Sequence, residues 1–231
     1  MLIANMVGRN EASRYLEDVL EHLSKIVDLI VFTDDCSEDN TVEIASRYAK
    51  VFSTNRPLFS LNEGELRTFA WSNLCEFAQS NRDWILAIDC DEKLWSTNPS
   101  FDMRSILNQE RFDVINIKFF HMWNSSQYRV DKLWAPNNSS RLFRFYDGGL
   151  FSDRKLACGS EPTYVNELIR RGKYCKDSPL VMQHLGYLRD DDKIMKYQRY
   201  MELDGGDFHQ KSHIESIVDP NPVLLDWNIY A

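Results

Sequence analysis

Three acidic residues stand within four positions after an apolar segment. Asp89, Asp91 and Glu92 follow residues 84–88, which have the length and composition of a buried strand. Carboxylates at the end of a buried strand are costly unless a cation meets them there. Mg²⁺ and Mn²⁺ prefer oxygen ligands, usually one or two carboxylates together with phosphate oxygens and water. The pattern therefore predicts a divalent metal that carries a phosphorylated ligand, although an Asp-x-Asp taken alone is more often a pair of solvated loop acids.

A second acidic cluster, residues 34–41, follows another strand-like segment, residues 29–33. Part of it is explained as a polar turn and a helix N-terminus, because Asp39, Asn40 and Thr41 suit such positions. Asp35 is better placed for binding, since a carboxylate at a strand end can accept a hydrogen bond from a base N–H. Asp35 is therefore the predicted determinant of nucleotide selectivity.

Strand and helix patterns alternate through the first 92 residues. Strands are predicted at residues 2–7, 29–33, 51–53 and 84–88. Helices are predicted between them, over residues 16–27, from about residue 40 and over residues 64–79, each with apolar residues at helical spacing. This alternation predicts an α/β fold with a Rossmann-like, mostly parallel central sheet flanked by helices. Ligands of such sheets gather at the carboxyl ends of the strands, where both acidic clusters lie.

The pattern changes after residue 95. Strands are predicted at residues 113–120, 141–145 and 180–184, with polar loops at 124–126 and 137–140, and a helix at 190–203. Gly205 and Gly206 break that helix, and the tail from residue 207 reads as a docked arm or a partly ordered segment. We expect one domain, residues 1–231, made of an α/β half (1–95), a mixed half (96–189) and a C-terminal helix and tail (190–231).

Composition narrows the class of protein. The chain has 231 residues, 43% of them hydrophobic and 27% charged, as in ordinary globular proteins. Its net charge of −8 argues against a general nucleic-acid binder. No apolar run has membrane-spanning length, and the N-terminus reads as a first strand rather than a signal peptide. The five cysteines have no CxxC pair, which predicts free thiols and a cytoplasmic location. Peripheral membrane contact and the oligomeric state are left open.

Three segments in order, residues 3–11, 31–41 and 84–92, resemble the family 2 glycosyltransferases of the GT-A fold. They correspond to the opening strand with its Asn-Glu, the Asp-Asp-x-Ser-x-Asp-x-Thr turn and the Asp-x-Asp-Glu metal motif of that family. The resemblance covers residues 1–95 well and thins thereafter. It implies a nucleotide-diphosphate sugar as donor, Mn²⁺ or Mg²⁺, and inverting transfer of the sugar to a hydroxyl of a glycan or another acceptor.

The resemblance also implies residue roles in the first half. Asp35 resembles the acid that binds the donor's base, Asp89 the contact to ribose or to a metal-bound water, and Asp91 the direct metal ligand, while Glu92 is structural. Arg67 matches an arginine that many members place against the nucleotide. Thr68 follows it where the family often has Asn, and a surface helix arginine is an equally good reading of Arg67.

In the second half, His184 resembles the histidine of a His-x-Gly-Tyr segment and is the expected third metal ligand or diphosphate contact. The helix after it would carry Lys193, Lys196, Arg199 and Tyr200. Arg141 and Arg144 match the family pattern, and we expect one of them to face the diphosphate unless both lie on an exposed edge strand.

Inverting transfer needs a carboxylate base for the acceptor hydroxyl. The family's usual His-Glu segment is absent, so Glu161 is the first candidate, with Asp153 and Glu167 behind it. Trp123 and Trp134 flank polar loops and are candidates for stacking on a sugar.

Two alternatives stay open. A sugar nucleotidyltransferase should have a Gly-rich phosphate loop with basic residues after its first strand, and residues 8–11 fall short of that. A non-catalytic sugar-nucleotide-binding module would explain the missing base, but the intact Asp89 and Asp91 speak against it.

Overall fold

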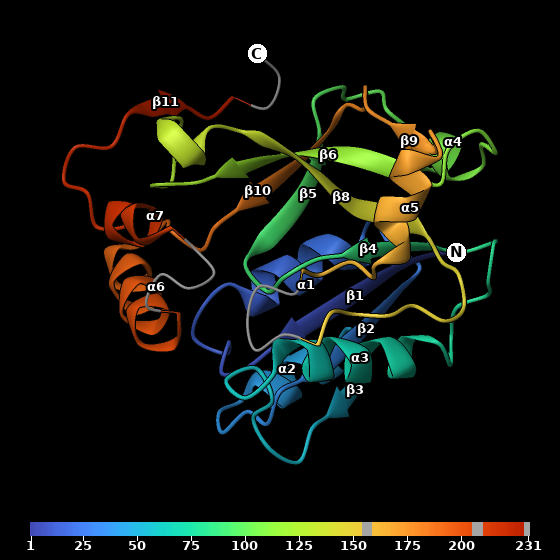
Figure 1. The fold of residues 1–231 in the computed structure, drawn as a ribbon, viewed down its shortest axis with the longest axis horizontal. Helices are drawn as coiled ribbons and strands as arrows, with labels where there is room; N and C mark the ends of the chain where they lie inside the picture. The colour runs from blue at the N-terminus through green and yellow to red at the C-terminus, as the bar shows by residue number, and fades with distance from the viewer. Residues whose placement is uncertain (154–158, 205–209, 229–231) are drawn as a thin grey trace.

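The computed structural model describes residues 1–153, 159–204 and 210–228 (Figure 1). The first half contains β1 (Leu2–Gly8), α1 (Leu16–Ser24), β2 (Leu29–Asp34), α2 (Thr41–Ser46), β3 (Lys50–Ser53), α3 (Glu63–Leu74), β4 (Trp84–Ala87) and β5 (Glu92–Ser96). The second half contains α4 (Met103–Leu107), β6 (Val114–His121), β7 (Gln127–Arg129), the 3-10 helix η1 (Lys132–Trp134), β8 (Asn137–Arg144), α5 (Tyr164–Arg170), β9 (Tyr174–Cys175), β10 (Leu180–His184), α6 (Asp190–Leu203), α7 (Lys211–Ser216) and β11 (Leu224–Asp226).

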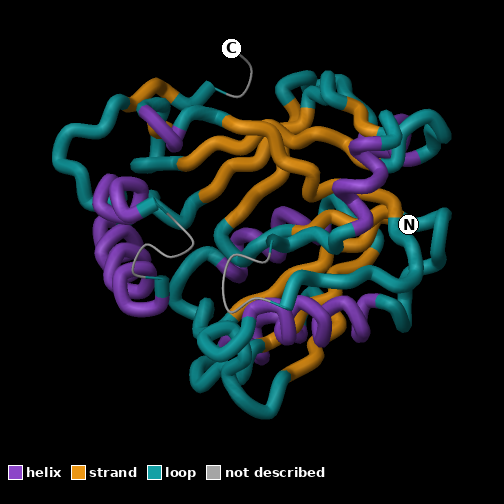
Figure 2. The backbone as a smooth tube through the Cα atoms, viewed as in Figure 1, coloured by secondary structure: helices purple, strands orange, loops and turns teal. Residues whose placement is uncertain are grey.

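One large sheet passes through both halves, with helices on both of its faces (Figure 2). Its strand order is β3-β2-β1-β4-β8-β6-β10-β5, and β9 pairs with β6. The strands β3, β2, β1 and β4 are parallel to one another, as predicted for an α/β fold. β8 is antiparallel to both β4 and β6 and joins the two halves. The division of the chain at residues 95 and 189 stays a prediction.

Alternation along the central strands explains why helices cover both faces. In β1, Leu2, Ala4 and Met6 pack with the apolar stripe of α1, whereas Ile3 packs with residues of α3 on the opposite face. Strands that bury both faces read as continuous apolar runs, and this is the pattern at residues 84–88. The acids that follow this run are therefore held at the end of a fully buried strand.

The strands predicted in the first half are confirmed to within a residue or two, and those at 180–184 and the helix at 190–203 have the predicted bounds. Two predictions are wrong. The helix predicted over 64–79 ends at Leu74. Residues 137–140 form the start of β8 rather than a loop. They were predicted as a loop because they are polar, and they are polar because they line a cleft.

The tail forms a docked arm over its described part, residues 210–228; Gly205 and Gly206 lie outside the described residues. β11 pairs antiparallel with β7. Among the described residues, no helix has the length and apolar character needed to cross a membrane. Cys36, Cys75, Cys90 and Cys175 are free thiols, while a cytoplasmic location stays a prediction.

Candidate functional site

A cleft of about 830 Å³ opens at the carboxyl ends of β1, β4 and β10, with α3 and α6 contributing to its walls. It gathers seven of the eight predicted site residues: Asp35, Arg67, Asp89, Asp91, Arg141, Glu161 and His184. Asp153 is not among the lining residues. Its side chain is exposed, and it accepts a hydrogen bond of 2.6 Å from Asn62 Nδ2.

Residues 89–92 form a tight turn between β4 and β5, which two hydrogen bonds between Asp89 and Glu92 close. The backbone N–H of Asp89 donates to Glu92 Oε2 at 2.8 Å, and the N–H of Glu92 donates to the Asp89 carbonyl at 3.2 Å. Glu92 is only 1% exposed. This turn directs Asp89 and Asp91 to the cleft and keeps Glu92 beneath them.

Two arginines flank Asp89. Arg141 Nη1 donates to Asp89 Oδ2 at 3.1 Å and to Glu92 Oε2 at 2.7 Å, and Arg67 Nη1 lies 3.7 Å from Asp89 Oδ1. Burial raises the pKa of Asp89, but Arg141 and Arg67 outweigh burial and hold the pKa below its usual value. Burial raises the pKa of Glu92 to about 8, against the opposing charge of Arg141. Asp89 is thus an ionised acid that faces the cleft between two cations.

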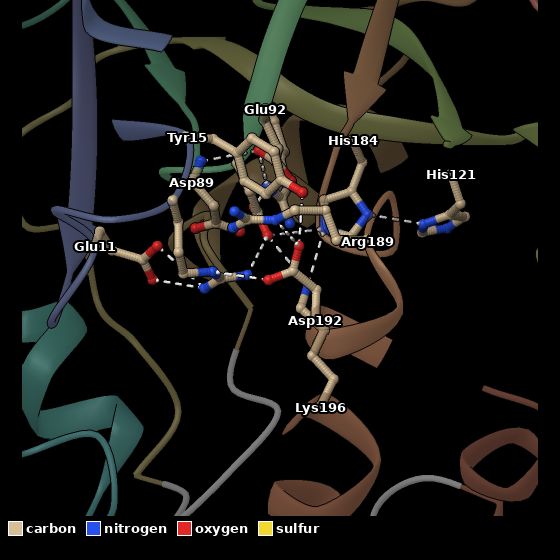
Figure 3. A network of polar contacts seen from close by, with 12 residues as sticks. Glu11, Tyr15, Asp89, Glu92, His121, His184, Arg189, Asp192 and Lys196 are labelled. Carbon is tan, nitrogen blue, oxygen red and sulfur yellow. Dashed lines mark hydrogen bonds and ion pairs between the residues drawn. The ribbon is translucent and has the colours of Figure 1, made fainter. Parts of the chain in front are cut away.

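Asp91 lies in an array of basic side chains, of which Figure 3 labels His184 and Lys196. Its Oδ2 lies 3.1 Å from Lys196 Nζ, 3.5 Å from His184 Nε2 and 3.9 Å from Arg14 Nη2. His184 Nδ1 lies 3.0 Å from His121 Nδ1. Burial raises the pKa of Asp91, yet Lys196 and His184 hold it well below the ordinary range. Burial and the Lys196 charge lower the pKa of His184. The array therefore combines an ionised carboxylate, a neutral imidazole and an ammonium group.

Three side chains that could ligate a metal ion lie close together, but Lys196 occupies the space beside two of them. Asp91, Glu92 and His184 each offer a ligand atom, and these atoms lie within 4.8 Å of one another. Lys196 Nζ contacts two of the three residues, at 3.1 Å from Asp91 Oδ2 and 3.2 Å from His184 Nε2. The oxygens of Glu92 already accept from Arg141 and from the Asp89 N–H. In this arrangement the residues do not fit a divalent ion.

Glu11 and Arg14 complete the wall beside Asp91. Arg14 Nη1 donates to both carboxylate oxygens of Glu11 at 3.0 Å, and Arg14 Nε donates to Asp192 Oδ1 at 3.2 Å. Burial raises the pKa of Glu11 to about 7, against the opposing charge of Arg14. Tyr15 OH also donates to Asp192, at 2.6 Å (Figure 3). These contacts tie the loop after β1 to the first turn of α6.

Sequence reasoning missed Arg14 and gave Lys196 no individual role. Glu11 and Arg14 stand three positions apart after the first strand, and this spacing of an acid and an arginine predicts that they form an ion pair. Lys196 stands four positions after Asp192, on the same face of α6, and this spacing predicts that both point inward.

Asp35 also lines the cleft and is 1% exposed. Its two carboxylate oxygens accept the backbone N–H groups of Leu58 at 2.6 Å and Phe59 at 3.0 Å. Asp35 thus fixes the loop that carries Phe59 and Ser60 into the lining. The rest of the turn is structural, as expected: Thr41 Oγ1 accepts the Glu11 N–H at 2.7 Å.

Glu161 also lines the cleft, where Ser140 Oγ donates to its Oε1 at 3.3 Å. Of the two arginines of β8, Arg141 faces the cleft, whereas Arg144 pairs with Asp113 at 2.8 Å and does not line it. β8 lies between β4 and β6 and is not an edge strand, so the reading of both arginines as exposed is wrong. The prediction that Trp123 and Trp134 stack on a sugar is also unsupported, because they are 5% and 1% exposed and pack against each other.

The family model described as glycosyl transferase family 2 matches residues 6–94. This segment contains all three sequence segments from which the resemblance was drawn, apart from the first residues of β1. No curated protein sequence matches the chain.

Among solved structures, a mannosyltransferase from Pyrobaculum calidifontis in complex with GDP-Man and Mn²⁺ is similar at a TM-score of 0.53 and 11% identity, over 96% of this chain and 65% of that one. Glucosyl-3-phosphoglycerate synthase from Mycobacterium tuberculosis is similar at 22% identity and a TM-score of 0.36, over 52% of this chain and 44% of that one. The chain thus spans less than two thirds of either protein. The likeness to the mannosyltransferase confirms the predicted α/β fold of the GT-A type.

Proposed function

We propose that this protein belongs to glycosyl transferase family 2, whose model matches residues 6–94, and that it transfers a sugar from a nucleoside-diphosphate sugar to an acceptor hydroxyl. The acceptor is a glycan or another hydroxyl compound. The proposal concerns the whole described cleft, not only the matched segment.

One observation carries this proposal: the acids of the matched segment and a set of cations share a single cleft. Asp35 and Asp89 lie in its lining together with Lys196, Arg14 and Arg141. A diphosphate carries negative charge along its length, and ammonium and guanidinium groups are the side chains that bind it by charge-assisted hydrogen bonds. Asp89 is then suited to the ribose end of the donor, and Asp35 supports the base end through the loop that it fixes at Leu58 and Phe59.

Glu161 is proposed as the base. The acceptor oxygen attacks the anomeric carbon, the bond between that carbon and the diphosphate oxygen breaks, and the acceptor proton passes to the Glu161 carboxylate. The nucleoside diphosphate leaves with the electron pair of the broken bond. Attack opposite to the leaving group gives inversion, and the cations of the cleft stabilise the charge that develops on the diphosphate.

The expected Mn²⁺ or Mg²⁺ is a separate question. A divalent ion bound by Asp91 and His184 would act as a Lewis acid toward the diphosphate. Because Lys196 contacts both of these side chains, we assign no step of the reaction to a metal.

Thermal unfolding with added UDP, GDP, CDP or dTDP, each in EDTA and in Mn²⁺, tests the donor site. At a hundredfold excess over its dissociation constant, a nucleotide that binds should stabilise the protein by about 2.7 kcal/mol. Asp89→Ala should reduce this stabilisation, whereas Asp153→Ala, outside the cleft lining, should not. Release of nucleoside diphosphate from the matching sugar nucleotide then measures turnover.

No stabilisation by any nucleotide in either buffer would contradict the proposed function. Binding without turnover on any acceptor would instead favour the non-catalytic module. Formation of a sugar nucleotide from a nucleoside triphosphate and a sugar phosphate would favour the nucleotidyltransferase.

A further inference from the structure

Lys196 Nζ contacts two of the three side chains, Asp91 and His184, whose ligand atoms could hold a metal ion in the cleft. Lys196 comes from α6, its side chain is 8% exposed, and its Nζ also lies 4.5 Å from the centre of the Tyr187 ring. A buried ammonium is costly unless it is paired and hydrogen-bonded. Asp91 and His184 meet this need at 3.1 and 3.2 Å (Figure 3).

The position of Lys196 is fixed by other contacts of its helix. One turn earlier, Asp192 accepts from Arg14 Nε at 3.2 Å and from Tyr15 OH at 2.6 Å, so the N-terminal part of α6 is anchored to the segment after β1. Gly186 faces the array on the other side. A methyl group built at Gly186 would collide with Lys196 Nζ and Asp91 Oδ2 and would lie 2.8 Å from His184 Nε2. The backbone is shaped to hold these three groups together.

The hydrogen-bond roles exclude a metal while Lys196 is in place. An ammonium group can only donate, so His184 Nε2 is the acceptor of the contact with Lys196. His184 then carries its proton on Nδ1 and donates it to His121 Nδ1 at 3.0 Å. The neutral Nε2 has one lone pair. Because that lone pair accepts from Lys196, it is not available to a metal ion.

Arg14 adds a second fixed cation at the same place. Its Nη2 lies 3.9 Å from Asp91 Oδ2 and has no hydrogen-bond partner within residues 1–153, 159–204 and 210–228. Lys196 and Arg14 thus flank one carboxylate oxygen with donors of positive charge, and the Arg14 donor is unsatisfied.

We propose that the Lys196 ammonium, assisted by Arg14, is the resident cation of the diphosphate site, so that donor binding does not depend on a divalent metal. The inference rests on the proposed function. As the bond between the anomeric carbon and the diphosphate oxygen breaks, the N–H groups of Lys196 and Arg14 stabilise the leaving diphosphate without transferring a proton. Donor binding is then expected to depend on Lys196 rather than on a divalent metal.

Calorimetric titration of UDP, GDP, CDP and dTDP tests the inference in wild type, Lys196→Met and the control Lys193→Met. Lys193 lies on the same helix, pairs with Asp190 at 2.9 Å and is not in the cleft lining. Wild type and Lys193→Met should bind the preferred nucleotide equally well in EDTA and in Mn²⁺. Lys196→Met should bind it about tenfold or more weakly in EDTA, because a charge-assisted hydrogen bond is lost. Mn²⁺ should restore binding to this variant, since Asp91 and His184 are then free to ligate the ion.

Electron paramagnetic resonance of Mn²⁺ gives a readout that is independent of the nucleotide. Lys196→Met should remove free Mn²⁺ from solution, and wild type should not. Nucleotide binding by wild type that requires Mn²⁺ would overturn the inference and leave the proposed function standing, as would an unchanged affinity of Lys196→Met in EDTA. Absence of nucleotide binding under all conditions would overturn the proposed function, and the inference with it.

Discussion

Four consecutive residues at the end of β4 have four different environments. Asp89 faces the cleft between Arg141 and Arg67, and Asp91 faces Lys196 and His184. Cys90 points into the core, where its Sγ lies 3.4 Å from the Val7 carbonyl, and Glu92 is buried against Arg141. The apolar strand before them predicted that cations must meet these acids. It could not predict that the cations are side chains, because they come from α3, β8 and α6, which are distant in sequence.

Glu161 and Asp153 were predicted together as bases, and the structure separates them. Replacement of Glu161 by Gln removes the proton acceptor but keeps the shape of the side chain. We expect turnover to fall about a hundredfold or more. The dissociation constant of the nucleoside diphosphate should stay the same. Steady-state release of nucleoside diphosphate, combined with calorimetric titration, measures both quantities.

The control is Asp153→Asn, which changes an exposed acid bonded to Asn62. This variant should keep turnover within about twofold of wild type, as is usual for surface substitutions. A full rate for Glu161→Gln would assign the base to another residue.

At the scale of elements, much of the first half of the chain was predictable because β1, β2 and β4 bury both faces and α1 has one apolar stripe. The strands of the second half were less predictable from the sequence. β8 begins with the polar residues 137–140, which line the cleft, and β5 begins at Glu92 inside the acidic motif. These strands have polar residues where they line the cleft, so they lack the alternating apolar pattern by which a strand is identified in a sequence.

The tail is held by a cluster centred on the buried Arg129 of β7. The guanidinium donates to both carboxylate oxygens of Asp131, at 2.6 and 2.7 Å, and lies 4.6 Å from the centre of the Trp123 ring and 5.2 Å from that of Trp134. It also donates to the carbonyl of Ser216 at the end of α7. This explains why the two tryptophans are packed inside and are not presented to a sugar.

Arg129→Met should therefore destabilise the protein by about 3 kcal/mol, since removal of one member of a buried ion pair leaves the other without its partner. Urea unfolding followed by tryptophan fluorescence measures the loss. The double variant Arg129→Met/Asp131→Asn should recover part of it, because the Asp131 charge is removed together with its partner; Asp219, 3.4 Å from Arg129 Nη2, still loses its contact. Arg170→Met is the control: its side chain is 74% exposed and pairs with Glu167 on the surface of α5, so its effect should stay within about 0.5 kcal/mol. An equally small effect of Arg129→Met would contradict a structural role for the cluster.

At the scale of the whole molecule, one sheet supplies both sides of the cleft. β1 and β4 end at the donor-side acids, and β8, β6 and β10 bring Arg141, His121 and His184 to the same place. The order of strands along the sequence predicts that the donor-side acids lie together, since parallel strands end at one edge of a sheet. It does not predict that Arg141, His121 and His184 join them, because the antiparallel insertion of β8 between β4 and β6 has no local sequence signal. The cleft is thus a property of the complete sheet, and its chemistry depends on the stability of the whole domain.

Acid titration of the folded molecule gives a test at this scale. Asp28 ties β1 to α4, because its carboxylate accepts the Leu2 N–H at 2.7 Å and two bonds from Arg104 at 2.8 and 2.7 Å. The Arg104 hydrogen bonds lower the pKa of Asp28 to about 2 from its ordinary value of 3.8. A carboxyl whose pKa is lower in the folded state stabilises the protein above its unfolded pKa. This stabilisation is lost as the pH falls through the folded pKa, so the free energy of unfolding should decrease between about pH 4 and pH 2.

Asp28→Asn should be less stable than wild type at pH 7, and the difference should shrink as the pH falls to about 2, where about half of the wild-type carboxyl is protonated. Urea unfolding at a series of pH values measures both trends. Asp191→Asn removes an equal charge from an exposed position on α6 and should leave the pH dependence of wild type unchanged. A constant difference between wild type and Asp28→Asn across this range would mean that Asp28 contributes through its shape and not through its ionised pairing with Arg104.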